Sequence, residues 1–130
     1  MITADQILAH VAGDYILQSD WMATEKTKRS LAAAAHAFSY ALPFVIAFRP
    51  SWTALAVIIG THFVIDRWRL ARFVIYAKNF ISPPSRWVSW SDCAGTGYHK
   101  DVPPWMSVWL LIIVDNAMHI YINALALRYL

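Results

Sequence analysis

Long apolar runs separated by short polar segments dominate the chain. Residues 30–48 contain no formal charge, and residues 105–127 contain only Asp115. A helix rises about 1.5 Å per residue, so about 20 residues cross a hydrocarbon core of about 30 Å. Both runs predict membrane-spanning helices, over residues 30–48 and, beginning at a Pro-Pro pair, over residues 104–127.

A third apolar run covers residues 52–65 and continues as a more polar helical pattern to about residue 76. Arg49, Pro50 and Ser51 predict a tight connection between it and the preceding helix. Beyond it the composition changes to Pro, Ser, Gly and Trp with mixed charges. We therefore predict a helix over about 52–76, followed by a structured loop over about 77–103.

The first helix, predicted over residues 4–18, is short and carries a polar stripe. Gln6, His10, Asp14 and Gln18 recur every four residues and share one face, while apolar residues cover the rest. A signal peptide is not expected, because no basic segment precedes the run and its middle is polar. This pattern is typical of a helix in a bundle with its polar stripe directed inward.

Composition assigns these helices to a membrane protein. Hydrophobic residues make up 58% of the 130 residues, which include seven Trp and six Tyr. Charged residues make up 15%, well below the charged fraction of a soluble domain. Aromatic residues anchor helices at the headgroup level. The net charge of +3 does not indicate nucleic-acid binding, since the basic residues lie between apolar runs. The predicted fold class is an all-α integral membrane bundle of four helices in a single domain.

The distribution of Lys and Arg predicts the orientation. Three basic residues follow the first helix, Arg49 alone follows the second, six lie between Arg67 and Lys100, and Arg128 is alone at the C-terminus. Because cytoplasmic connections are rich in Lys and Arg, both termini are predicted outside, with the 19–29 and 67–103 connections in the cytoplasm. We expect a multi-pass membrane protein.

Ionisable residues within the predicted helices form a repeated pattern. The first and third helices each contain His-x-x-x-Asp, and the last, which runs in the opposite direction, contains Asp-x-x-x-His. The reversal places the Asp of each pair one turn nearer the cytoplasm and the His one turn deeper, with each pair on one helix face. This predicts a layer of carboxylates beneath a layer of imidazoles. His36 on the second helix completes the ring. The candidate metal ligands are His10, Asp14, His36, His62, Asp66, Asp115 and His119.

A divalent metal explains why such groups lie at membrane depth. Each charge there costs at least about 2.5–3.5 kcal/mol, and several carboxylates repel one another. Mixed imidazole and carboxylate ligands suit zinc, manganese or iron, as one or two ions. Gln18, Tyr40 and Asn123 lie on the same stripes and are predicted to support the ligands. A single buried His, such as His36 alone, is equally well explained as a hydrogen-bonded core residue.

Two further groups lie outside this pattern. A basic set beside the third helix is predicted to contact anionic headgroups, or alternatively to hold a phosphate-bearing substrate. His99 is predicted to be a surface residue. The single cysteine, Cys93, excludes an internal disulfide. The basic set is Arg67, Arg69, Arg72 and Lys78.

These motifs resemble a family of small bacterial and phage membrane proteins of unknown function with the signature His-x-x-x-Gly-Asp-x-x-Leu-Gln. The resemblance implies the bacterial inner membrane as the location. Asn116 stands where that family's pattern has Gln. More distantly, the spaced His and Asp residues resemble those of membrane-bound metal-dependent hydrolases. The matching residues are His10, Gly13, Asp14, Leu17, Gln18, Asp20, Trp21, Met22, Ala23, Lys26, Lys28, His36, His62, Asp66, Asp115 and His119.

Two classes of function stay open at this level. One is a metal-dependent hydrolase that acts on a lipid-linked or phosphate-ester substrate from the cytoplasmic side. The other is a non-catalytic membrane protein that binds or relays cations or protons, or that serves a phage by acting on the host membrane. Acyl-enzyme chemistry is not indicated, because no Gly-x-Ser-x-Gly motif occurs. No catalytic residue is assigned.

Overall fold

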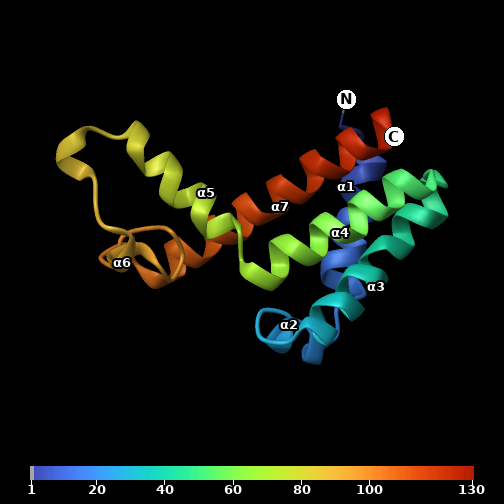
Figure 1. Cartoon of the computed structure of the whole chain (residues 1–130), viewed down its shortest axis with the longest axis horizontal. Helices are drawn as coiled ribbons and strands as arrows, with labels where there is room; N and C mark the ends of the chain where they lie inside the picture. The colour runs from blue at the N-terminus through green and yellow to red at the C-terminus, as the bar shows by residue number, and fades with distance from the viewer. Residues whose placement is uncertain (1) are drawn as a thin grey trace. The chain divides into compact units, whose positions relative to one another are not determined.

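The computed structural model describes residues 2–130, which contain helices and connections but no strand. It divides into two compact units. The first contains the described residues up to Arg69 together with His119–Leu130, and the second is Leu70–Met118. The main helices are α1 (Ala4–Val11), α2 (Asp20–Glu25), α3 (Ser30–Phe48), α4 (Trp52–Trp68), α5 (Ala71–Lys78), α6 (Trp90–Cys93) and α7 (Pro104–Tyr129), as Figure 1 shows.

An antiparallel helix pair, α3 and α4, organises the first unit (Figure 1). The predicted tight connection between them is present. Arg49 ends α3 in the left-handed conformation, with φ of 47°, and the Ser51 side chain accepts a hydrogen bond from the Ala54 amide at the start of α4. This cap satisfies one of the otherwise unpaired amides of the first turn.

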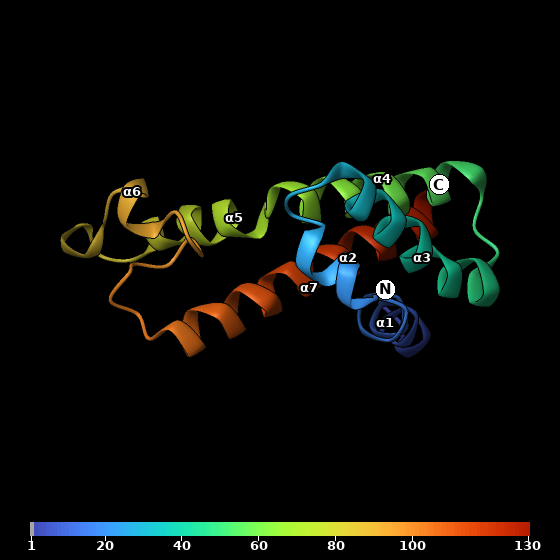
Figure 2. The ribbon, with the colours of Figure 1, turned by 90° about the horizontal axis from the view of Figure 1, so that it is seen from below.

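The first helix packs against α3 and crosses it. Figure 2 shows α1 nearly end-on, while α3 and α4 extend across the view. Thr3 and Gln6 form a capping box at its start. Gln6, His10 and Asp14 are buried, so the predicted polar stripe faces the interior over most of its length.

A π-helical turn, η1 (Ala12–Ile16), continues α1. Such turns insert an extra residue into a helix and are frequent at functional sites. Gly13 lies in this turn, where an added Cβ would be 2.6 Å from the Tyr40 carbonyl oxygen. The absence of a side chain therefore allows η1 to approach α3 closely beside Asp14.

The helix predicted over 52–76 is divided. Arg69 adopts a left-handed conformation, with φ of 52°, and ends α4; α5 begins at Ala71. A non-glycine residue rarely adopts this conformation, and it interrupts the helical hydrogen bonds. The short helix α2 is also additional, because residues 19–29 were predicted as a connection.

The second unit is held together by aromatic and backbone contacts. The rings of Phe73 and Trp90 stack, with centroids 4.9 Å apart, and Asn79 donates a hydrogen bond to the Gly97 carbonyl. Gly97 has φ of 85° and lies directly against the backbone of Arg72, a conformation and a proximity that favour glycine. The segment predicted as a structured loop is thus folded onto α5 through specific contacts.

Two helices of the described chain, α3 and α7, are long and apolar enough to cross a membrane. The prediction of four spanning helices is therefore not confirmed. Helix α4 has 17 residues and carries the charged residues Asp66 and Arg67 in its last turn. The segment formed by α1 and η1 is shorter still. Length and polarity separate these helices from the two apolar ones.

Replacing Gly13 with Ala should destabilise the protein. The new Cβ would collide with backbone and ring atoms of Tyr40, and overpacking of this kind costs about 1–3 kcal/mol. Gly60→Ala is the matched control, since no atom lies within 4 Å of its Cβ position and alanine favours a helix. Thermal unfolding in detergent should show a midpoint temperature below that of wild type for Gly13→Ala but not for Gly60→Ala. A wild-type midpoint in Gly13→Ala would exclude the close approach of η1 to α3.

Candidate metal centre

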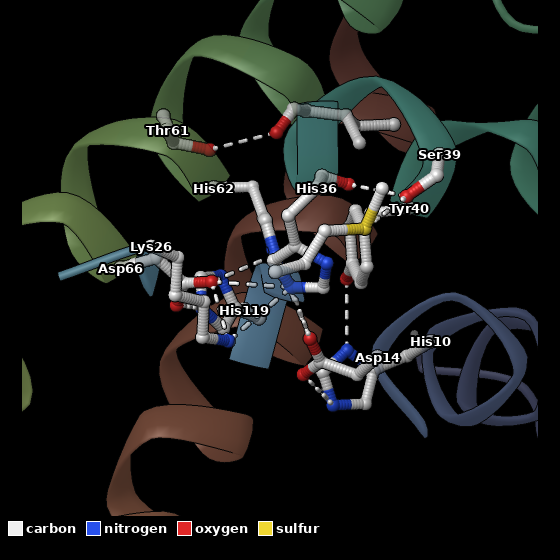
Figure 3. Close-up of polar contacts among 12 residues, drawn as sticks. His10, Asp14, Lys26, His36, Ser39, Tyr40, Thr61, His62, Asp66 and His119 are labelled. Carbon is white, nitrogen blue, oxygen red and sulfur yellow. Dashed lines mark hydrogen bonds and ion pairs between the residues drawn. The ribbon is translucent and has the colours of Figure 1, made fainter. Parts of the chain in front are cut away.

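Six of the seven predicted ligands meet in one buried cluster inside the first unit (Figure 3). They come from four separate helical segments: α1 and η1, α3, α4, and the C-terminal part of α7. The most exposed of the six side chains is only 8% exposed. The six are His10, Asp14, His36, His62, Asp66 and His119.

Four of these residues form an inner group. Asp14, His36, His62 and Asp66 each direct one donor atom to a common region, and these four atoms lie within 4.8 Å of one another. His36 Nε2 is 3.1 Å from Asp14 Oδ1 and 3.2 Å from Asp66 Oδ2. His62 Nε2 is 3.5 Å and 3.2 Å from the same two oxygens. These buried Asp and His groups are close enough to hold a metal ion.

Each carboxylate uses its two oxygens differently. Asp14 directs Oδ1 to the inner group, while its Oδ2 lies 3.6 Å from His10 Nε2. Asp66 directs Oδ2 inward, while its Oδ1 lies 3.3 Å from His119 Nε2. His10 and His119 therefore orient the two carboxylates from outside the inner group, as imidazole partners of ligating carboxylates do in metal sites.

The hydroxyl group of Tyr40, on α3, contacts side chains of α1 and α7. Its hydroxyl oxygen accepts a hydrogen bond from Asn123 Nδ2 at 2.5 Å and lies 2.8 Å from His10 Nδ1. The hydroxyl proton can then be donated to His10 Nδ1, which leaves the Nε2 proton of His10 facing Asp14. The Tyr40 ring also stacks on His62, with centroids 3.6 Å apart, so one side chain positions both an inner and an outer imidazole.

One donor atom of the inner group, His62 Nε2, is buried and forms no hydrogen bond among residues 2–130. It lies 3.2 Å from Asp66 Oδ2, whose charge is offset by the Lys26 ammonium at 2.8 Å. Buried polar atoms are nearly always paired, and an exception needs an explanation. A metal ion between the inner ligands would pair this nitrogen, so the donor set fits a metal.

Lys26 enters the same cluster and was not predicted as part of it. Its ammonium lies 2.8 Å from Asp66 Oδ2 and 3.3 Å from His36 Nε2. The positively charged run at residues 26–29 indicated only membrane orientation. No periodic signal marks Lys26, because it follows the short helix α2 and reaches the cluster from a connection.

The remaining predicted residues lie outside the inner group. Asp115 is on α7 one turn before His119 but belongs to the second unit, so its role as a ligand stays a prediction. Gln18 lies beyond the end of η1, and its Oε1 is buried with no hydrogen-bond partner in the described chain. His99 is in the second unit, 3.2 Å from Asp101.

The predicted basic set is engaged in local contacts. Arg67 donates to the Thr27 carbonyl, Arg72 donates to the Ala94 carbonyl, and Lys78 donates to the Tyr98 hydroxyl. Arg69 forms the left-handed end of α4. These contacts give each residue a structural role, and binding of headgroups or phosphate stays a prediction.

A family comparison covers nearly the whole chain. The family described as "Protein of unknown function (DUF3307)" matches residues 2–129. The chain belongs to this family. No curated protein and no solved structure shows a significant match. Membership supports the predicted resemblance to a family without an assigned function.

Removing the Tyr40 hydroxyl should loosen the cluster. Tyr40→Phe retains the ring that stacks on His62 but leaves buried His10 and Asn123 groups without this partner, at a cost of about 1–3 kcal/mol. Tyr121→Phe is the control, because Tyr121 is 61% exposed. Thermal unfolding should distinguish the two, and an unchanged midpoint for Tyr40→Phe would contradict the role assigned to the hydroxyl.

Proposed function

We propose that this protein binds one divalent metal ion through Asp14, His36, His62 and Asp66. The observation that carries the proposal is the convergence of four buried donor atoms from three helical segments within 4.8 Å. Two imidazoles and two carboxylates suit zinc, manganese or iron. His10 and His119 orient the ligands, and the number of ions proposed here is one because only this group is complete within one unit.

The charges of the site favour a divalent ion. Two buried carboxylates, Asp14 and Asp66, face each other across the inner group. Buried carboxylates without compensation are strongly unfavourable in a medium of low dielectric constant. Lys26 offsets one negative charge, whereas a divalent ion would offset both.

We further propose that the protein spans the inner membrane of a bacterium more than once. Large apolar side chains of α3 are exposed, including Leu31, Phe38 and Ile46, and α7 exposes Trp105 and Trp109. Such surfaces are unfavourable in water but suit lipid. With α3 and α7 as the spanning helices, the shorter helices would pack against them with their polar faces inward.

Metal-dependent hydrolysis of a lipid-linked or phosphate-ester substrate is the reaction we propose for the site. A bound divalent ion supplies Lewis acidity for the attack of water on an ester. The chain's own contribution is to hold the ligands and to keep one end of the site dry. The apolar cluster of Phe44, Ala54, Ile58 and Ala126, which adjoins Tyr40, closes that end.

A cation or proton relay is the alternative that this apolar cluster disfavours. A relay requires a polar path through the whole membrane. Beyond Tyr40, α3 and α4 contribute Phe44, Phe48 and Ile58 to the packed core. A one-sided site therefore agrees better with the packing than a through-path.

Elemental analysis of detergent-purified protein tests the metal proposal. We expect about one equivalent of zinc, manganese or iron per chain. It should be lost in His62→Ala, which removes an inner donor atom, and in Asp66→Asn, which removes the negative charge of an inner ligand. His99→Ala, outside the cluster, should retain the metal. Metal-free wild-type protein that also fails to bind added zinc or manganese would contradict the proposal.

Phosphate-ester hydrolysis by the loaded protein tests the reaction. We expect activity with a lipid-phosphate substrate that disappears on treatment with a chelator and returns on adding the metal. Asp14→Asn should lower the rate by at least about tenfold, since it removes a charged ligand. Stoichiometric metal without hydrolysis of any phosphate or lipid ester would favour a non-catalytic role.

A further inference from the structure

Lys26 is the one residue of the basic segment at 26–29 that turns into the cluster. Its neighbours are paired on the surface, where Glu25 contacts Lys28 at 3.1 Å and Arg29 at 3.2 Å. The Lys26 side chain, 19% exposed, is largely buried instead. The segment thus directs one cation inward and neutralises the others locally.

The Lys26 ammonium contacts the atoms that the metal would use. It lies 2.8 Å from Asp66 Oδ2 and 3.3 Å from His36 Nε2, and both atoms belong to the inner group (Figure 3). An ammonium has three protons to donate and no lone pair. Its hydrogen bonds therefore occupy the same lone pairs on oxygen and nitrogen that would coordinate an ion.

We propose that Lys26 is a tethered cation that competes with the metal for the inner group and has to withdraw when the metal binds. This inference rests on the proposed metal site and adds its regulation. An ammonium and a divalent ion cannot share Asp66 Oδ2 without strong repulsion at such short distances. Metal binding is then an exchange of one cation for another.

The chain holds the base of this side chain in place while its end can move. Arg67 at the end of α4 donates to the Thr27 carbonyl at 2.7 Å and to Ser30 Oγ at 3.3 Å, which fixes the backbone next to Lys26. The lysine side chain has four flexible methylene groups, and its partial exposure gives the ammonium access to water. Withdrawal needs only side-chain rotation, without separation of the helices.

The exchange makes metal affinity depend on residue 26. Removing the ammonium eliminates a charge-assisted hydrogen bond that stabilises the metal-free state and therefore opposes metal binding. Such bonds contribute about 1.5–3 kcal/mol, equivalent to roughly tenfold or more in metal affinity. Lys26→Met should therefore bind the metal at least about tenfold more tightly than wild type. Lys28→Met is the matched control, because it removes the same charge from an exposed neighbour.

The test is titration of metal-free, detergent-purified protein with zinc against a competing chromophoric chelator. We expect tighter binding by Lys26→Met and wild-type affinity for Lys28→Met and Lys26→Arg, which keeps the cation. Lys26→Gln, which keeps most of the side-chain length without the charge, should also bind more tightly and serves if Lys26→Met does not fold. Thermal unfolding adds a second readout: the lysine variants without charge should be less stable than wild type only in the metal-free state.

The outcomes separate this inference from the metal proposal. If wild type, Lys26→Met and Lys28→Met all bind zinc with equal affinity, the competition is overturned and the metal site stands. Zinc binding by neither wild type nor Lys26→Met would overturn both. Zinc binding by Lys26→Met with none by wild type would contradict the exchange, because Lys26 would then block the site and not withdraw from it.

Discussion

The burial of the Asp66 carboxylate is the constraint on which the first unit depends. Its side chain is 3% exposed, yet His36, His62, His119 and Lys26 all lie within 3.3 Å of its oxygens. A carboxylate in such surroundings must be compensated, because its desolvation is otherwise too costly. The partners come from three other segments of the chain, so compensating this one charge requires α3, α4, α7 and the connection after α2 to meet.

The same constraint explains the local irregularities of the fold. The π-helical turn and Gly13 bring Asp14 close to α3, and the hydroxyl of Tyr40 fixes His10 behind it. Tyr40 also belongs to an apolar cluster with Phe44, Ala54 and Ile58. Polar groups thus converge at one level, where they satisfy one another, and the rest of the helix pair is stabilised by side-chain packing.

Much of this arrangement follows from the sequence, because periodicity reports which face of a helix is buried. The bounds 30–48 of the second predicted helix are those of α3, and the i, i+4 spacing of His62 and Asp66 places both in the cluster. The two long apolar runs became the two helices that are long and apolar enough to cross a membrane. The shorter and more polar helices of the described chain, residues 2–130, lack the length and composition that α3 and α7 have.

The remaining features depend on tertiary contacts that leave no periodic signal. The left-handed Arg69 divides the predicted 52–76 helix, although its residue type gives no warning of a break. The carboxylates also do not form a layer apart from the imidazoles; each carboxylate lies between them. Lys26 reaches the site from a connection whose composition indicated only orientation. A side chain held by long-range contacts cannot be identified from spacing alone.

X-ray absorption spectroscopy of zinc-loaded protein tests most directly whether two imidazoles and two carboxylates of the inner group coordinate one ion. We expect about four nitrogen and oxygen neighbours at roughly 2.0–2.2 Å, with the outer-shell scattering of two imidazoles. In His62→Ala the imidazole scattering should fall to that of one ring. A spectrum with sulfur neighbours, or with a shell of water oxygens and no imidazole scattering, would contradict it.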